Sequence, residues 1–108
     1  MCKCLVVQIF FANTRTKKFF ESIEARMKSE VVTGLGYLSR YGYALRMPIS
    51  KPLGGGLFEL RIIERGHIRF IYTFHDGSVK ILHGFVKKTN KIPQKELEYA
   101  KKQLHSLS

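Results

Sequence analysis

The chain has few of the features that mark several large classes of protein. Its 108 residues include two cysteines and eight acidic residues, and no tryptophan. No apolar run approaches the roughly 20 residues that a membrane-spanning helix needs. The apolar stretch at the N-terminus is too short for a signal peptide and lacks a small-residue cleavage site. We therefore expect a cytoplasmic protein with no membrane segment, folded as a single domain over residues 1–108.

The scarce cysteines also exclude two kinds of site. Cys2 and Cys4 stand one residue apart, a spacing that rarely meets disulfide geometry within a strand. No second Cys or His pair follows to complete a zinc site. The glycine run at 54–56 has no following Lys-Ser/Thr and precedes a strand, so it is not a phosphate-binding loop. We expect reduced thiols, no metal and no cofactor.

Positive charge is abundant. Nineteen Lys and Arg against eight Asp and Glu give a net charge of +11, which predicts a polyanionic partner: nucleic acid, an anionic membrane surface or an acidic protein. The excess is uneven along the chain. Between residues 65 and 95 the only acidic residue is Asp76, whereas the basic residues there are Arg65, Arg69, Lys80, Lys87, Lys88, Lys91 and Lys95.

Hydrophobic periodicity predicts a strand and two helices in the first half. The strand covers residues 5–11, and Asn13 or Thr14 can cap the helix that follows. That helix carries an apolar stripe: Phe19, Phe20, Ile23 and Met27. A second helix is predicted over residues 30–41, ending at Gly42, and residues 43–56 are predicted to be loop.

The second half predicts three antiparallel strands and a helix. The strands cover residues 57–63, 67–74 and 79–85, joined by turns at 64–66 and 76–77. Asp-Gly strongly favours a two-residue hairpin because both positions need positive φ. Pro93 opens the last helix, whose inner side carries Leu97, Ala100 and Leu104. The predicted fold class is α+β: N-terminal strand, helical hairpin, three-strand antiparallel meander and C-terminal helix.

The two turns determine which residues face each other. Arg61 is predicted opposite Arg69, and Gly84 beside Arg69. One face, covered by the helical hairpin, is predicted to hold the core: Phe58, Leu60, Ile62, Ile68, Phe70, Tyr72, Phe74, Val79, Ile81 and Phe85. The other is predicted to hold the polar residues Glu59, Arg61, His67, Arg69, Thr73, Lys80 and Gly84, above an apolar floor of Ile71 and Leu82.

The facing arginines suggest a site. Two directly opposed cations repel, and a bound phosphate would explain both through bidentate contacts. The alternative is that Glu59 or Glu64 neutralises one of them. A glycine in a central strand often marks close approach of a ligand, and Lys87 and Lys88 would extend the patch. His67 shares the face, although an exposed turn histidine is the simpler interpretation, while His83 is predicted to be a hydrogen-bonded core histidine opposite Phe70.

Several segments also carry a family resemblance: residues 52–62, residues 68–72, the run Leu82-His83-Gly84-Phe85-Val86-Lys87-Lys88-Thr89, and Pro93. They resemble the HigB-like branch of the RelE/ParE toxin superfamily. The predicted N-terminal strand and helical hairpin, followed by Tyr41-Gly42 and Met47-Pro48, also fit the family's order of elements, so the resemblance covers nearly the whole chain. The resemblance implies a RelE-like fold and an endoribonuclease that cleaves mRNA on the ribosome. It also implies neutralisation by a helix-turn-helix antitoxin of the HigA type.

The resemblance implies site residues as well. Arg61 matches a basic residue that helps deprotonate the ribose 2′-hydroxyl, Arg69 the arginine that stabilises the pentavalent phosphate, and Lys88 a charged residue on the leaving-group side. RNA would also contact His67, Lys80, Gly84, Lys87 and Lys91.

One departure keeps a second function open. Some RelE enzymes have a catalytic tyrosine or histidine in the C-terminal segment, and residues 91–95 contain neither. Arginine stays protonated and is a poor base, so Arg61 would act electrostatically. The alternative is a non-enzymatic protein: a ParE-like gyrase poison or an inactive antitoxin-binding homologue.

Overall fold

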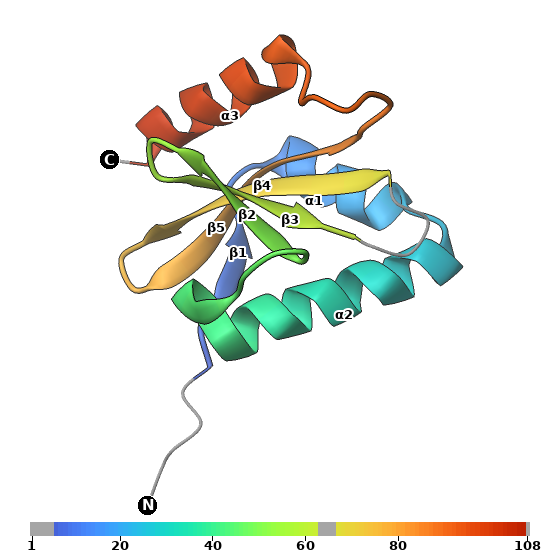
Figure 1. The fold of residues 1–108 in the computed structure, drawn as a ribbon, viewed down its shortest axis with the longest axis horizontal. Helices are drawn as coiled ribbons and strands as arrows, with labels where there is room; N and C mark the ends of the chain where they lie inside the picture. The colour runs from blue at the N-terminus through green and yellow to red at the C-terminus, as the bar shows by residue number, and fades with distance from the viewer. Residues whose placement is uncertain (1–5, 63–66, 108) are drawn as a thin grey trace, which may run out of the picture.

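The computed structural model describes residues 6–62 and 67–107. A five-stranded sheet in the order β1-β5-β4-β3-β2 has helices on both faces (Figure 1). The elements are β1 (Ile9–Phe11), α1 (Thr14–Ser22), α2 (Ala25–Tyr41), a 3-10 turn η1 (Gly42–Ala44), β2 (Ser50–Gly54), β3 (Leu57–Arg61), β4 (Ile68–His75), β5 (Ser78–Val86) and α3 (Gln94–Ser106). The predicted α+β class is confirmed, with one strand more than expected.

The helical hairpin forms as predicted but divides at a different point. Asn13 caps α1 by accepting a hydrogen bond from the Thr16 backbone N–H at 2.8 Å. Ile23 then turns to an extended conformation, with φ −69° and ψ 136°, and ends the helix. The prediction that one helix runs through Met27 is therefore wrong, because Met27 belongs to α2. The periodic stripe continues across the break because both helices pack on the same core.

The expected loop over residues 43–56 contains a strand. β2 pairs with β3 in antiparallel register, Ser50 opposite Leu60 and Lys51 opposite Glu59. Pro52 and the glycines conceal this strand in the sequence, since proline is tolerated only where no ladder hydrogen bond is needed, as on an edge strand. The N-terminal strand joins the opposite edge and runs parallel to β5; its described part is shorter than predicted.

The central hairpins confirm the predicted pairing of Arg61 with Arg69, and of Tyr72 with Ile81. The turn at 64–66 lies outside the described residues. At the other turn, Asp76 has φ 51° and Gly77 φ 74°, as an Asp-Gly hairpin requires.

A register shift next to Ile71 and Tyr72 changes the pairing further along β4 and β5. His83 lies opposite Ile71, Gly84 opposite Phe70, and Phe85 opposite Arg69. The predicted pairings of Phe70 with His83 and of Arg69 with Gly84 are therefore wrong. Because a bulge adds one residue on one strand, all three residues change face relative to the prediction.

Each face of the sheet has its own core. The hairpin face packs α1 and α2 against a buried cluster of Val31, Leu38, Leu60, Ile62, Ile68, Phe70, Tyr72, Val79 and Ile81, which confirms that the helical hairpin covers the predicted core. The α3 face holds a smaller cluster of Leu57, Ile71, Leu82, Phe85 and Ala100, with Leu97 and Leu104 packed against it. The face predicted to be polar is thus partly covered by α3.

Candidate active site

The site lies on the α3 face, where β3 ends and β4 begins. Arg61 and Arg69 are directly paired across these strands, and Glu59 precedes Arg61 by two residues, so strand alternation places it on the same face. Lys87 follows β5, and its backbone N–H donates to the carbonyl of His67 just before β4. The hairpin and the end of β5 thereby bring three cations and one carboxylate together.

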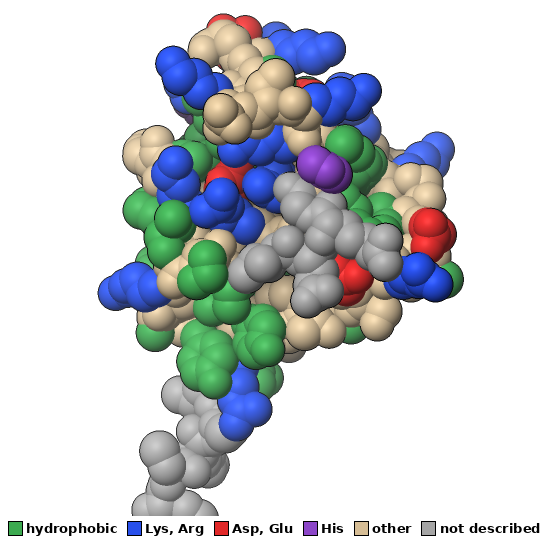
Figure 2. Space-filling model, turned by 45° about the vertical axis from the view of Figure 1, so that its right-hand side comes forward, with side chains coloured by type: hydrophobic (Ala, Val, Ile, Leu, Met, Phe, Trp, Pro, Cys, Tyr) green, Lys and Arg blue, Asp and Glu red, His purple; other side chains and the backbone are tan. Residues whose placement is uncertain are grey.

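Glu59 is the centre of this group. Its Oε1 lies 3.8 Å from Arg61 Nε, and its Oε2 lies 3.8 Å from Arg69 Nε and 3.9 Å from Lys87 Nζ. Glu59 is 1% exposed, beneath the cations. We call these four residues the Glu59 cluster; Figure 2 shows Lys and Arg side chains gathered around an acidic one on this face.

The electrostatics of the cluster leave a net positive charge for a ligand. Burial lowers the pKa of Arg69, the carboxylate of Glu59 opposes that shift, and the charge of Arg61 adds to it. A guanidinium nevertheless stays charged at neutral pH. Within the Glu59 cluster one carboxylate stands against three cations, a net charge of +2, and a phosphodiester, which carries one negative charge, would neutralise half of this excess. The side chain of Arg61, 29% exposed against 10% for Arg69, is the more accessible arginine.

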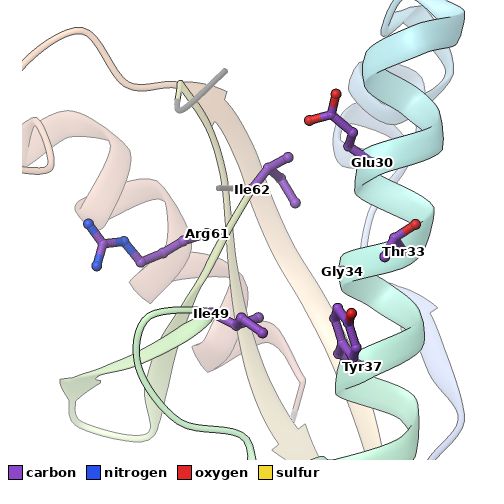
Figure 3. A pocket seen from close by; sticks show the side chains of 7 residues that line it. All are labelled: Glu30, Thr33, Gly34, Tyr37, Ile49, Arg61 and Ile62. Carbon is purple, nitrogen blue, oxygen red and sulfur yellow. The ribbon is translucent and has the colours of Figure 1, made fainter. Parts of the chain in front are cut away.

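A hollow borders the cluster on the other side of β3 (Figure 3). Its volume is about 350 Å³, and it is lined by Glu30, Thr33, Gly34, Tyr37, Ile49, Arg61 and Ile62. Ile49 and Ile62 extend toward α2, whereas the guanidinium of Arg61 points away from that helix. Only the stem of Arg61 therefore lines this hollow, and its charge belongs to the Glu59 cluster.

The other predicted site residues are not members of the Glu59 cluster, although His67 adjoins it through the hydrogen bond from the Lys87 N–H to its carbonyl. Lys88 and Lys91 are exposed in the loop between β5 and α3. Lys80 lies five residues before Phe85, or about 16 Å along the strand, and its Nζ sits 4.3 Å from the centroid of the Phe10 ring. His67 is exposed immediately before β4.

The prediction that Gly84 faces the ligand is wrong. A Cβ at this position would lie 2.6 Å from Phe19 Cδ2 and 2.7 Å from Phe70 Cε1, on the hairpin face. Close packing of α1 on the sheet, and not approach of a ligand, accounts for this glycine. The register shift that moves Gly84 is what changes the interpretation.

His83 is buried and hydrogen-bonded, as predicted, but on the opposite face. Its Nε2 lies 2.7 Å from Oε1 of Glu96 on α3. Burial lowers the pKa of His83; the hydrogen bond and charge of Glu96 oppose this, and Arg15 adds to it. Glu59 and His83 each pair with Ile71, one from β3 and one from β5, so they lie about 10 Å apart across the sheet.

The sequence predicts the full importance of only part of this cluster. It places Glu59 on the correct face, but as a possible neutralising charge for one arginine, and it gives Lys87 a smaller role than Lys88. Lys51 is missing from the predicted site, yet it pairs with Glu59 from β2 and so adds an exposed cation on the same face. The spacing of two residues between Glu59 and Arg61 is the signal for Glu59, whereas Lys51 can be found only once β2 is recognised as a strand.

The arrangement of side chains and helices in the described residues bears on metal binding and on membrane insertion. Within residues 6–62 and 67–107, no group of three or more His, Cys, Asp or Glu side chains is arranged to hold a metal ion. In the same ranges no helix combines the length and apolar character that crossing a bilayer requires.

Solved structures define the class of fold. The chain resembles a chain of the RelE–RelB complex from Pyrococcus horikoshii OT3, with 19% identity and a TM-score of 0.58, covering 76% of this chain and 96% of that one. The YoeB–YefM toxin–antitoxin complex from Staphylococcus aureus matches at 22% identity and TM-score 0.55, covering 77% and 97%. The YoeB/ParE toxin from Agrobacterium tumefaciens matches at 15% and 0.57, covering 76% and 100%. The fold is that of the RelE/YoeB toxins.

A family profile places the chain more narrowly. Residues 18–105 match the family described as "Phage derived protein Gp49-like (DUF891)". The chain therefore belongs to this Gp49-like family, which is a RelE/ParE-like toxin family. The search of curated proteins finds no match.

Proposed function

We propose that this chain is the toxin of a toxin–antitoxin pair and that it cleaves mRNA on the ribosome. The observation that carries the proposal is the Glu59 cluster, in which paired Arg61 and Arg69 and the adjacent Lys87 share one buried carboxylate. This arrangement suits a phosphodiester better than a neutral ligand, because bidentate arginines match phosphate geometry and charge.

The chemistry follows from where charge develops. The ribose 2′-hydroxyl loses its proton and its oxygen attacks the adjacent phosphorus, which breaks the bond from phosphorus to the 5′-oxygen. The 5′-oxygen takes up a proton, so the products are a 2′,3′-cyclic phosphate and a free 5′-hydroxyl. The pentavalent state carries extra negative charge, so cations that contact it lower the barrier more than they stabilise the ground state. Arg69 would stabilise that phosphate, with Arg61 beside it. Lys88 would act on the leaving-group side from the exposed loop.

Glu59 would act through the cations. At 1% exposure Glu59 presents almost no surface to a substrate hydroxyl. Its carboxylate holds Arg61, Arg69 and Lys87 within 3.9 Å, which opposes their mutual repulsion and keeps them oriented. We therefore treat Glu59 as a positioning residue.

The proposed partner is a helix-turn-helix antitoxin of the HigA type. The related Staphylococcus aureus structure is a toxin–antitoxin complex, which supports an antitoxin for this chain as well. The net charge of +11 favours a partner that is acidic or that covers the basic face.

The test is cleavage of mRNA in a pre-assembled ribosome complex, read by primer extension. We expect cleavage products with a 2′,3′-cyclic phosphate, and we expect EDTA to leave activity intact as long as the ribosome complex survives. Loss of cleavage on adding EDTA to an intact complex would show that the metal-independent mechanism is wrong.

A ParE-like gyrase poison is the second candidate. The observation favouring it is that His83, the buried histidine on this face, is held by Glu96 about 10 Å from Glu59 and so is not in place to transfer a proton. Inhibition of gyrase supercoiling by the purified chain, without mRNA cleavage, would support this alternative.

A further inference from the structure

A second group of basic side chains lies where α1 meets α3. A hollow of about 390 Å³ between these helices is lined by Arg15, Lys95, Glu96, Glu98, Tyr99 and Lys102. Three of these side chains are cations, and all three are exposed. The hollow contains no residue of the Glu59 cluster, so it is a separate surface with its own charge.

The cations are arranged along one side of α3. Lys95, Tyr99 and Lys102 stand at positions i, i+4 and i+7, which places them in one stripe on a helix. The rise of the helix separates the two lysines by about 10 Å. Arg15 joins the stripe from α1, with its Cζ 4.5 Å from the centroid of the Tyr99 ring. This contact both holds the guanidinium beside the stripe and covers the aromatic ring.

The two carboxylates of the hollow do not form salt bridges with its cations. Glu96 is hydrogen-bonded to the buried His83 at 2.7 Å, and Glu98 accepts a hydrogen bond from Gln94 at 3.2 Å. Within the described ranges 6–62 and 67–107, the salt bridges involve neither Arg15 nor the two lysines of the stripe. Three cations against two carboxylates leave the hollow with a net charge of +1, and the three cationic side chains are exposed to a ligand.

The stripe is continuous along the chain with the Glu59 cluster. Lys87 belongs to the cluster, and the exposed Lys88 and Lys91 follow it in the loop that leads to Lys95. Figure 2 shows Lys and Arg side chains at the end of the molecule where α3 lies as well as in the middle of the same face. The segment that joins the cluster to α3 is therefore itself basic.

We propose that the surface formed by Arg15, Lys95 and Lys102 binds the phosphodiester backbone of a structured RNA while the Glu59 cluster acts on the strand to be cut. This inference rests on the proposed RNA-directed function and extends it to a second contact. The ligand is the backbone and not unstacked bases, because Arg15 covers the aromatic ring of Tyr99. RNA duplexes are recognised through just such backbone contacts.

The experiment measures binding of a short, fluorescently labelled RNA duplex to the purified full chain over a range of salt concentrations. The test variant is Lys95→Gln/Lys102→Gln. The control is Arg26→Gln/Arg40→Gln, which removes the same charge from exposed positions of α2, on the opposite face of the sheet from α3 (Figure 1). We expect the test variant to lower the slope of log affinity against log salt by about one for each lysine removed, and the control to retain the slope.

Three results would overturn the inference: no duplex binding by the unaltered chain, equal loss of slope in both variants, or displacement of the duplex by polyglutamate at equal charge concentration. The last would indicate an acidic protein as the ligand. Because an uncut duplex is the probe, the outcome does not depend on cleavage. If mRNA cleavage fails but the slope changes only in the test variant, the proposed nuclease is wrong and the RNA surface stands.

Discussion

Arg61 and Arg69 face each other directly across β3 and β4, and the carboxylate of Glu59 lies 3.8 Å from the Nε of each. Two like charges in directly opposed strand positions destabilise a sheet unless something compensates them. Here a buried carboxylate provides part of the compensation, and Lys87 adds a third cation at 3.9 Å. The net positive charge that remains is the basis of the first two predictions.

Replacing Arg69 should affect cleavage more than replacing Arg61. Arg69→Ala is expected to lower the rate of mRNA cleavage by about 10²–10³-fold, or about 2.7–4 kcal/mol, by analogy with the loss of one preorganised charge-stabilising donor. Arg61→Ala should cost less, because the more exposed guanidinium acts through better-screened electrostatics, and Lys88→Ala should also cost less. Single-turnover cleavage on ribosome complexes measures this, and full activity of Arg69→Ala would rule out its role.

Replacing Glu59 should destabilise the fold through cation repulsion. Glu59→Gln keeps the shape but leaves three cations without their shared carboxylate, and we expect a loss of about 3 kcal/mol in the free energy of unfolding, as when a buried pair is broken. Glu98→Gln is the matched control, since it removes the same charge from an exposed position. Both are measured by urea denaturation.

A double variant separates repulsion from simple loss of packing. Glu59→Gln/Arg61→Gln should recover part of the lost stability, because one of the repelling cations is gone. An additive or larger loss in the double variant would contradict the electrostatic explanation.

Adding a methyl group at Gly84 should destabilise the protein. Its Cβ would overlap Phe19 and Phe70 at 2.6–2.7 Å, and overpacking of this kind costs about 1–3 kcal/mol. Gly36 offers the control, because a Cβ there meets nothing within 4 Å, and Ala in a helix is favoured over Gly by up to about 1 kcal/mol. Opposite signs for Gly84→Ala and Gly36→Ala in urea denaturation are expected, and a neutral Gly84→Ala would disprove the close packing.

Stability should fall as the solution is acidified through the ordinary pKa of histidine. Burial lowers the pKa of His83 in the folded chain, against the opposing effect of Glu96, so the unfolded chain binds the proton more readily. The stability contributed by neutral His83 is therefore complete above about pH 6.5 and declines below it, until the folded pKa is reached. Urea denaturation at about pH 7.5 and 5.5 should show a smaller decline in His83→Gln than in the unaltered chain; an equal decline would exclude His83 as the source.

Much of the local structure could be predicted from the residues because its causes are local. Asn13 caps a helix through a bond to Thr16, three residues away, and Asp76 and Gly77 take the positive φ values that their hairpin needs. The pairing of Arg61 with Arg69 follows from the turn predicted at 64–66, which sets the register of the two strands. Alternation likewise places Glu59 on their face, so two arginines and a carboxylate of the candidate site were within reach of sequence reasoning.

The remaining features depend on contacts between segments far apart in the chain. The register shift in β4 and β5 puts Gly84 under Phe19 of α1, and the same shift moves His83 to Glu96 on α3. A period of two residues cannot reveal such a shift, because one extra residue reverses the face of all that follow it. The sequence by itself determined the elements, the turns and the facing arginines. Only the tertiary structure decided that Glu59 is buried and that three cations share it, since Lys87 reaches it from the far end of β5.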